Sequence, residues 1–170
     1  LLQILEINLY FMKLSDTIKS ENIIFPLEAK DRSSAIQEML NRLLELNYLT
    51  ETIKLYSFID HKDKLINSAV GRGTAYHHST SMEINDQLAV FGFSPEGIDY
   101  DSPDGQKVHF ILLILDTHDD SNLHRKLINR FQHFINDYNY RTKVIDCKSI
   151  NSLANLINDW ENEYLLNEDI

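Results

Sequence analysis

Residues 107–115 read Lys-Val-His-Phe-Ile-Leu-Leu-Ile-Leu, and this run is the strongest strand signal in the chain. It is apolar on both faces of an extended backbone, which is typical of a strand inside a sheet that is covered on both sides. We therefore predict a central strand here. A second continuous apolar run, Leu-Ala-Val-Phe-Gly-Phe over residues 88–93, predicts another buried strand.

Two helical patterns precede these strands. Apolar residues recur at helical spacing from about residue 31 to residue 46, and Asp31 or Ser33 can cap the start of this helix. A second helical stretch opens at Thr50 and ends near Asp63. The N-terminal part of the chain is therefore expected to form a pair of helices.

Turns, helices and a short strand complete the pattern. The turn clusters at residues 95–97 and 102–105 are predicted to bracket a short extended segment. An amphipathic helix is expected over about residues 123–135, Val-Ile-Asp at 144–146 is interpreted as an edge strand, and Ser149 caps a last helix. We therefore predict an α/β fold of one domain, in which a mixed β-sheet is flanked by helices.

The domain is expected to span residues 12–170. Residues 1–11 are apolar but include Glu6 and lack a basic segment, so they do not have the pattern of a signal peptide. Met12 is interpreted as the natural start, which makes residues 1–11 a non-native or extra N-terminal segment.

The composition is that of an acidic globular domain, with 43% apolar and 25% charged residues and a formal net charge of −10. That charge repels phosphate backbones and anionic lipids, so nucleic-acid binding and membrane insertion are not expected. No apolar run approaches the ~20 residues that cross a bilayer. The single cysteine, Cys147, excludes an intrachain disulfide and suits a reducing compartment, so we predict a cytoplasmic location.

Histidine is the residue type that indicates chemistry. His77 and His78 end a strand-like segment that follows Gly71-Arg72-Gly73, where glycines permit close approach of a partner or a phosphate group. Because adjacent strand residues point to opposite faces, only one of the two should face a given pocket. His124 follows Asp119-Asp120-Ser121 near a helix start, where free amide groups would stabilise a phosphorylated histidine. The other histidines are interpreted as structural or solvated: His61, His109, His118 and His133.

Two other kinds of site are less well supported. A metal site made of His78, His124 and a carboxylate is chemically conceivable, but no ligand pair has the close helical spacing that is typical of zinc sites, so no metal is predicted. A hydrolase that uses a histidine with a carboxylate lacks a recognisable nucleophile motif such as Gly-x-Ser-x-Gly.

From about Lys13 onward, the ordered features resemble the enzyme IIA domain of the sugar-phosphotransferase system, of the mannitol/fructose/nitrogen-regulatory type. The signature of that family is a Gly-x-Gly pair, an aliphatic residue, Ala, an aliphatic residue, Pro and the phosphorylated His. Residues 71–78 read Gly-Arg-Gly-Thr-Ala-Tyr-His-His and match both glycines, Ala75 and the final His78. Three positions depart from the signature: Thr74 and Tyr76 replace aliphatic residues, and His77 replaces the proline.

Other stretches carry the same resemblance. Lys62-Asp63 and Asn67-Ser68 stand where the family has an Arg-Glu pair and a Ser-Thr pair. Gly97-Ile98-Asp99-Tyr100, followed by Asp104-Gly105 and the apolar strand, is similar to the family's order of Gly-Ile-Asp-aromatic, Asp-Gly and strand. His124 falls at the position of the family's second histidine.

The resemblance implies that His78 and His124 lie close together at one edge of the sheet. His78 would take a phosphoryl group from the small carrier HPr, or from a nitrogen-branch relative of HPr, and pass it on without a metal or an organic cofactor. The residues expected to support the phosphoryl group are Lys62, Ser68, Gly71, Gly73 and His77.

The destination of the phosphoryl group stays open. In transport it would go to an enzyme IIB and then to a sugar, whereas in regulation the phosphorylation state would control a target protein. The atypical Tyr76 and His77 favour the regulatory branch slightly. The alternative is an interaction module that keeps the fold but has lost phosphotransfer through the changes at Lys62 and His77.

Overall fold

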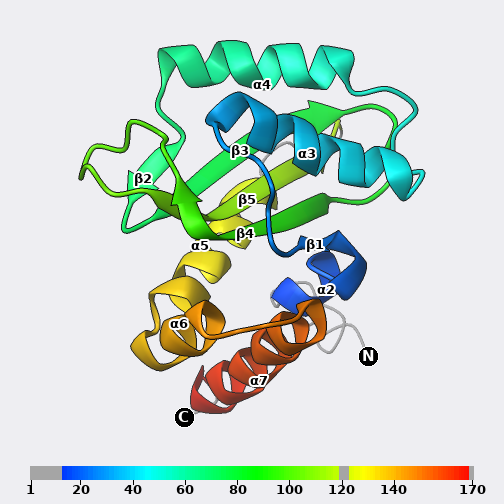
Figure 1. The fold of residues 1–170 in the computed structure, drawn as a ribbon. Helices are drawn as coiled ribbons and strands as arrows, with labels where there is room; N and C mark the ends of the chain where they lie inside the picture. Colours follow the sequence, from blue (N-terminus) through cyan, green and yellow to red (C-terminus); the bar gives the residue numbers. More distant parts are fainter. Residues whose placement is uncertain (1–12, 119–122, 169–170) are drawn as a thin grey trace, which may run out of the picture.

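The computed structural model of this chain describes residues 13–118 and 123–168 (Figure 1). The segment 1–11, expected to be non-native or extra, lies outside the described residues. In chain order the elements are α2 (Leu14–Thr17), the 3-10 helix η1 (Ser20–Asn22), β1 (Ile23–Ile24), α3 (Arg32–Glu45), α4 (Ile53–Leu65), β2 (Ala69–Gly71), β3 (Thr74–Ser81), β4 (Leu88–Ile98), β5 (Val108–Thr117), α5 (Leu123–Asn136), α6 (Tyr138–Ile145) and α7 (Ile150–Glu168).

The strands of the described residues form one mixed sheet in the order β1-β4-β5-β3-β2. β5 lies at the centre, antiparallel to β4 and parallel to β3, so the prediction of a central strand at residues 107–115 is confirmed. β1 pairs with β4 in parallel, and β2 pairs with β3 in antiparallel fashion. The apolar residues of β5 are buried on both faces, as expected for a strand between two helical layers.

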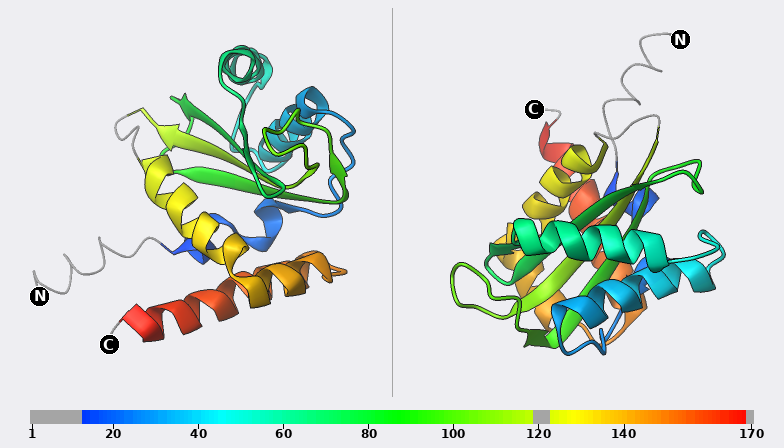
Figure 2. Two further views of the ribbon diagram at one scale, coloured as in Figure 1. Left: turned by 90° about the vertical axis from the view of Figure 1, so that its left-hand side faces the viewer. Right: turned by 90° about the horizontal axis from the view of Figure 1, so that it is seen from above.

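Helices cover both faces of the sheet (Figures 1 and 2). α3 and α4 lie on one face, while α5, α6 and α7 lie on the other. Met39 of α3 and Leu113 of β5 belong to the first core, and Phe131 of α5 and Leu112 of β5 belong to the second. The predicted α/β fold, with a mixed sheet flanked by helices in a single domain, is confirmed. Within the residues that the structure describes, no helix combines the length and the apolar character needed to cross a bilayer.

Two helices begin at residues that the sequence marks as caps. At α3 the Asp31 carboxylate accepts a hydrogen bond from the Ser34 amide (2.8 Å), and the Ser34 hydroxyl accepts one from the Asp31 amide (3.2 Å). This reciprocal pair is a capping box. At the start of α7 the Ser149 hydroxyl accepts a hydrogen bond from the Ser152 amide (3.2 Å), as predicted.

The prediction of an edge strand at residues 144–146 is wrong, because this stretch ends helix α6. The Asp137 carboxylate accepts hydrogen bonds from the amides of Asn139 and Tyr140 (2.9 and 3.2 Å), which caps the helix. Tyr140 and Val144 lie one turn apart and are both buried. Burial at this helical spacing overrides the strand propensity of the β-branched pair at 144–145.

The turn predicted at residues 95–97 is also wrong. β4 continues through these residues to Ile98, with an irregularity in its pairing to β5 after Phe93. Gly97 has a φ of +71°, and a Cβ atom there would lie 2.7 Å from Cε1 of His109. The glycine lets the strand pass directly over the His109 ring without ending the sheet.

The strand that carries the neighbouring histidines is longer than predicted. β3 pairs with β5 over all eight residues from Thr74 to Ser81, so His77 and His78 lie within the strand and not at its end. The register with β5 extends the strand beyond the point where the apolar pattern stops. β2 pairs only with the start of β3 in the described residues, so the histidines occupy the part of β3 that runs along the sheet edge.

Candidate functional site

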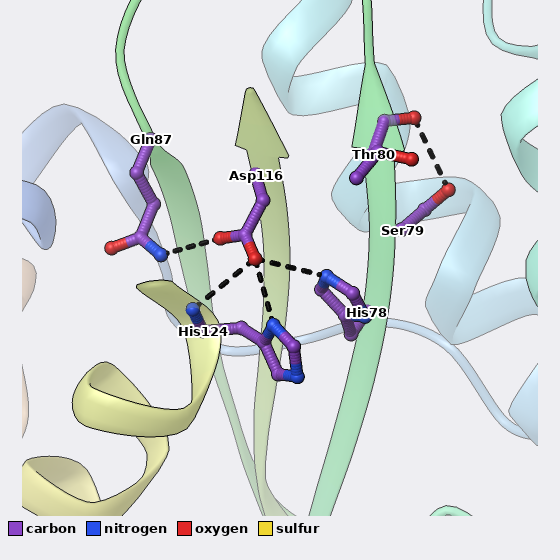
Figure 3. A network of polar contacts seen from close by, with 6 residues as sticks. All are labelled: His78, Ser79, Thr80, Gln87, Asp116 and His124. Atoms are coloured by element: carbon purple, nitrogen blue, oxygen red, sulfur yellow. Dashed lines mark hydrogen bonds and ion pairs between the residues drawn. The ribbon is translucent and has the colours of Figure 1, made fainter. Parts of the chain in front are cut away.

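Two histidines from different elements meet on the α5 face of the sheet. His78 comes from β3 and His124 from the first turn of α5, and their rings stack with centroids 3.7 Å apart and planes inclined by 21° (Figure 3). Their side chains are 17% and 18% exposed, so both are accessible from solvent. The segment Asp119-Asp120-Ser121, which precedes His124 in the sequence, lies outside the described residues.

A buried carboxylate holds both rings. Oδ2 of Asp116, near the end of β5, accepts hydrogen bonds from His124 Nδ1 (2.7 Å), from the His124 amide (3.2 Å) and from His78 Nε2 (3.2 Å). Oδ1 of Asp116 accepts a hydrogen bond from the Gln87 side-chain amide (2.6 Å) (Figure 3). Because Asp116 is fully buried and every contact is directional, these bonds fix the orientation of the two imidazoles.

Sequence reasoning missed Asp116 and Gln87. A signal for Asp116 was present, because it directly follows the apolar run. Side chains two residues apart on a strand face the same side, so Asp116 faces the α5 side together with Leu112 and Ile114. A carboxylate at a buried position requires hydrogen-bond partners. The sequence marks the position but does not identify those partners, and Gln87, in the segment before β4, carries no such signal.

The surroundings keep the His78 ring uncharged. Burial of the ring and the neighbouring His124 lower the pKa of His78 to about 4, with Lys62 adding to the effect and Asp116 opposing it. At neutral pH the ring is therefore neutral, and one of its nitrogens carries a lone pair. This is the nucleophilic form of an imidazole.

His77 points to the opposite face of β3, as the alternation of strand residues requires. It is buried, with Nδ1 2.8 Å from Oδ2 of Asp63 on α4 and Nε2 3.1 Å from the hydroxyl of Tyr100. The Nδ1–Oδ2 contact has the distance of an ion pair, although the N–H direction departs from the line between the two atoms. The structure therefore separates His77 from His78 and His124.

Lys62 and Ser68, which the sequence predicts as phosphoryl-site residues, differ in their surroundings. Lys62 is exposed near the end of α4, and its charge reaches His78, whose pKa it helps to lower. Ser68 is buried, and its carbonyl accepts a hydrogen bond from the amide of Tyr76 (3.0 Å), two residues before His78. The Ser68 hydroxyl is itself buried and has no hydrogen-bond partner in the described part of the chain.

Gly71 and Gly73 form the turn between β2 and β3 and do not lie beside His78. Their φ angles are +88° and +70°, a conformation that favours glycine. A Cβ atom on Gly73 would lie 3.2 Å from the Lys107 carbonyl oxygen. At ~3.3 Å per strand residue, His78 lies about 16 Å farther along the strand. The structure therefore gives both glycines a role in the turn.

The fold and the site together define an α/β domain that presents a neutral, partly exposed histidine on its surface, paired with a second histidine. The family described as phosphoenolpyruvate-dependent sugar phosphotransferase system, EIIA 2, matches residues 16–160. The chain belongs to this family of enzyme IIA domains.

Individual relatives include a fructose-specific component of the phosphotransferase system and a nitrogen regulatory protein from Bradyrhizobium diazoefficiens, the latter 26% identical over 133 residues that cover 78% of this chain and 86% of that protein. The chain is 24% identical over 147 residues to the fructose-specific EIIABC component of the phosphotransferase system from Bacillus subtilis. That match covers 86% of this chain but 23% of the relative, so the chain spans about a quarter of that protein's length.

Solved structures have the same fold. Nitrogen regulatory protein IIA-Ntr from Neisseria meningitidis superposes with a TM-score of 0.74 at 16% identity, covering 85% of this chain and 98% of that one. Enzyme IIA of the mannitol system from Escherichia coli, solved in complex with phosphorylated enzyme IIB, gives a TM-score of 0.69 at 18% identity and covers 84% and 99%.

Proposed function

We propose that this domain is a phosphoryl carrier that accepts a phosphoryl group on His78 and passes it to another protein. The observation that carries the proposal is the neutral and partly exposed His78 ring, stacked on His124 and oriented by Asp116. A nucleophile at the surface suits transfer between two proteins, because the partner must bring its own reactive group to it.

The transfer needs positioning and positive charge more than covalent help from the protein, since the transition state of phosphoryl transfer is loose. A ring nitrogen of His78 forms a new P–N bond while the P–N bond of the donor histidine breaks. Asp116 lies where it offsets the positive charge that develops on the His78 ring. Lys62, whose charge acts on the His78 ring, would supply positive charge to the phosphoryl oxygens.

The partners follow from the same chemistry. HPr or a related phosphocarrier would be the donor, and an enzyme IIB or a regulated protein the acceptor; this is supported by the family and by the complex of the Escherichia coli mannitol protein with its enzyme IIB. The net charge of −10 favours a basic docking surface on the partner. The single cysteine suits a reducing compartment, so we propose a cytoplasmic location.

The test is phosphorylation of the purified chain with phosphoenolpyruvate, enzyme I and HPr, followed by intact-mass measurement. The wild type and His77→Ala are expected to gain one phosphoryl group, and His78→Ala to gain none. His133→Ala is a matched control, because that histidine is exposed on α5 and lies away from the stacked pair. Label that persists in His78→Ala contradicts the proposed acceptor, and an unlabelled wild type favours the interaction module.

A further inference from the structure

We propose that His78, Asp116 and His124 form a binding site for one divalent transition-metal ion of the zinc type, and that this ion competes with the phosphoryl group for His78. One ligand atom from each residue lies within 4.8 Å of the other two. The sequence alone predicts no metal, because none of its ligand pairs has the close helical spacing that is typical of zinc sites. These ligands come instead from β3, β5 and α5, which only the tertiary structure brings together.

The donor set suits zinc. Two imidazole nitrogens and one carboxylate oxygen are a common three-ligand set for Zn²⁺, and they leave a fourth position for water or for a side chain of a partner. The His124 Nδ1 and His78 Nε2 atoms lie 2.7 and 3.2 Å from the same Asp116 oxygen. Ligand atoms around a tetrahedral ion with bonds of ~2.0–2.1 Å are about 3.3 Å apart, which is near the spacing of these atoms. Because the stacked rings are inclined by only 21°, they would also have to turn so that both lone pairs point at the ion. With the ion bound, His78 would carry its proton on Nδ1 and His124 would carry its proton on Nε2.

The surrounding contacts orient the carboxylate ligand. Gln87 donates to Oδ1 of Asp116 at 2.6 Å, and the His124 amide donates to Oδ2 at 3.2 Å. Such outer contacts fix metal ligands in place and raise affinity. The 17–18% exposure of the two imidazole side chains provides an entry path to the fully buried carboxylate.

Charge also favours a cation here. In the part of the chain that the structure describes, the ion pairs of Asp116 are those with the imidazoles of His78 and His124. Neither of these two ion pairs of the buried carboxylate is with a lysine or an arginine. A divalent ion would supply the positive charge that a buried carboxylate otherwise lacks.

A bound ion would occupy Nε2 of His78 and leave the ring's proton on Nδ1, so neither nitrogen would keep a lone pair for the phosphoryl group. This competition rests on the proposed function, whereas metal binding does not. In the opposite direction, a phosphorylated His78 would no longer complete the three-ligand set.

The test is calorimetric titration of the unphosphorylated full chain with Zn²⁺, together with the visible absorption of bound Co²⁺. One ion per chain is expected to bind. Asp116→Asn and His124→Ala should each lower the Zn²⁺ affinity at least tenfold, and Gln87→Ala should lower it by about 10–100-fold through loss of ligand orientation. His133→Ala should leave it unchanged, since it lies about 13 Å farther along α5. His124 is partly exposed, so its alanine variant is expected to stay folded, which circular dichroism checks.

Absence of saturable binding, or equal Zn²⁺ affinity in wild type, His124→Ala and Asp116→Asn, overturns the metal site. Chain phosphorylated on His78 should bind Zn²⁺ at least tenfold more weakly than unphosphorylated chain. Equal affinity of the two forms refutes the competition but leaves the site. Failure of the chain to accept phosphate while Zn²⁺ binding follows the variants refutes the proposed function and not the metal site.

Discussion

The ring of His78 stacks on the ring of His124 with centroids 3.7 Å apart, and both rings donate to one oxygen of Asp116. The parallel register of β3 and β5 pairs His78 with Ile114, two residues before Asp116, which places the histidine and the carboxylate on the same face. α5 follows β5 in the chain and returns His124 over that face. The pair is therefore built by the register of two adjacent strands and by the first turn of the next helix.

Replacing Asp116 by Asn should slow phosphorylation by about ten- to hundredfold. Asparagine keeps the size of the side chain but removes the charge that holds both imidazoles, and hydrogen bonds to a charged group contribute about 1.5–3 kcal/mol. Rapid-quench kinetics with phosphorylated HPr measure the rate. Gln87→Ala, which removes only the contact to Oδ1 of Asp116, should have a smaller effect. An Asp116→Asn variant as fast as wild type would show that the carboxylate does not orient the pair for transfer.

The imidazole of His78 should titrate near pH 4, well below the ordinary value of 6.5 for histidine. Its neutral form then persists through the physiological range, so transfer to it should be nearly independent of pH above about 5.5. His124→Ala and Lys62→Met should each raise the pKa of His78, because each removes an influence that lowers it. NMR titration of the ring nitrogens measures all three pKa values. Ordinary titration of His78 in the wild type would contradict the proposed environment.

Acid should destabilise the fold through the same residue. His78 has a lower pKa in the folded chain than in the unfolded chain, so the unfolded state binds more protons as the pH falls from about 6.5 to about 4. The free energy of unfolding should therefore decrease across this window, by at most about 3 kcal/mol from this group. Urea unfolding at several pH values measures the decrease. His78→Gln, which cannot be protonated there, should show a shallower decrease, and equal slopes would argue against this contribution.

Loss of the imidazole at His77 should destabilise the protein strongly. His77→Ala removes the imidazole beside the buried Asp63 carboxylate and leaves that polar group without its neighbour, which costs about 3 kcal/mol. Tyr100→Phe removes only the 3.1 Å contact to Nε2 and should cost about 1 kcal/mol. Chemical denaturation compares the two variants. Similar costs would mean that the contact between His77 and Asp63 contributes little. Folded His77→Ala should still accept phosphate, since His77 faces away from the His78 and His124 pair.

Much of the fold could be predicted from the sequence because it depends on local periodicity. The run at 107–115 identified the central strand, and Asp31 and Ser149 marked two helix starts. The predictions failed where local propensity and tertiary burial disagree. Residues 144–146 have strand propensity, yet they end a helix because Tyr140 and Val144 fill the core at helical spacing.

The candidate site divides in the same way. The sequence alone determined that one of two adjacent histidines would face a site, because neighbouring side chains of a strand point to opposite faces. The tertiary structure decided the rest. It placed His78 on His124, put Asp116 beneath both rings, and assigned His77 to a separate buried pair with Asp63. These contacts depend on strand register and on the return of a helix over the sheet, and such long-range geometry is set by packing of the whole domain and has no local sequence pattern.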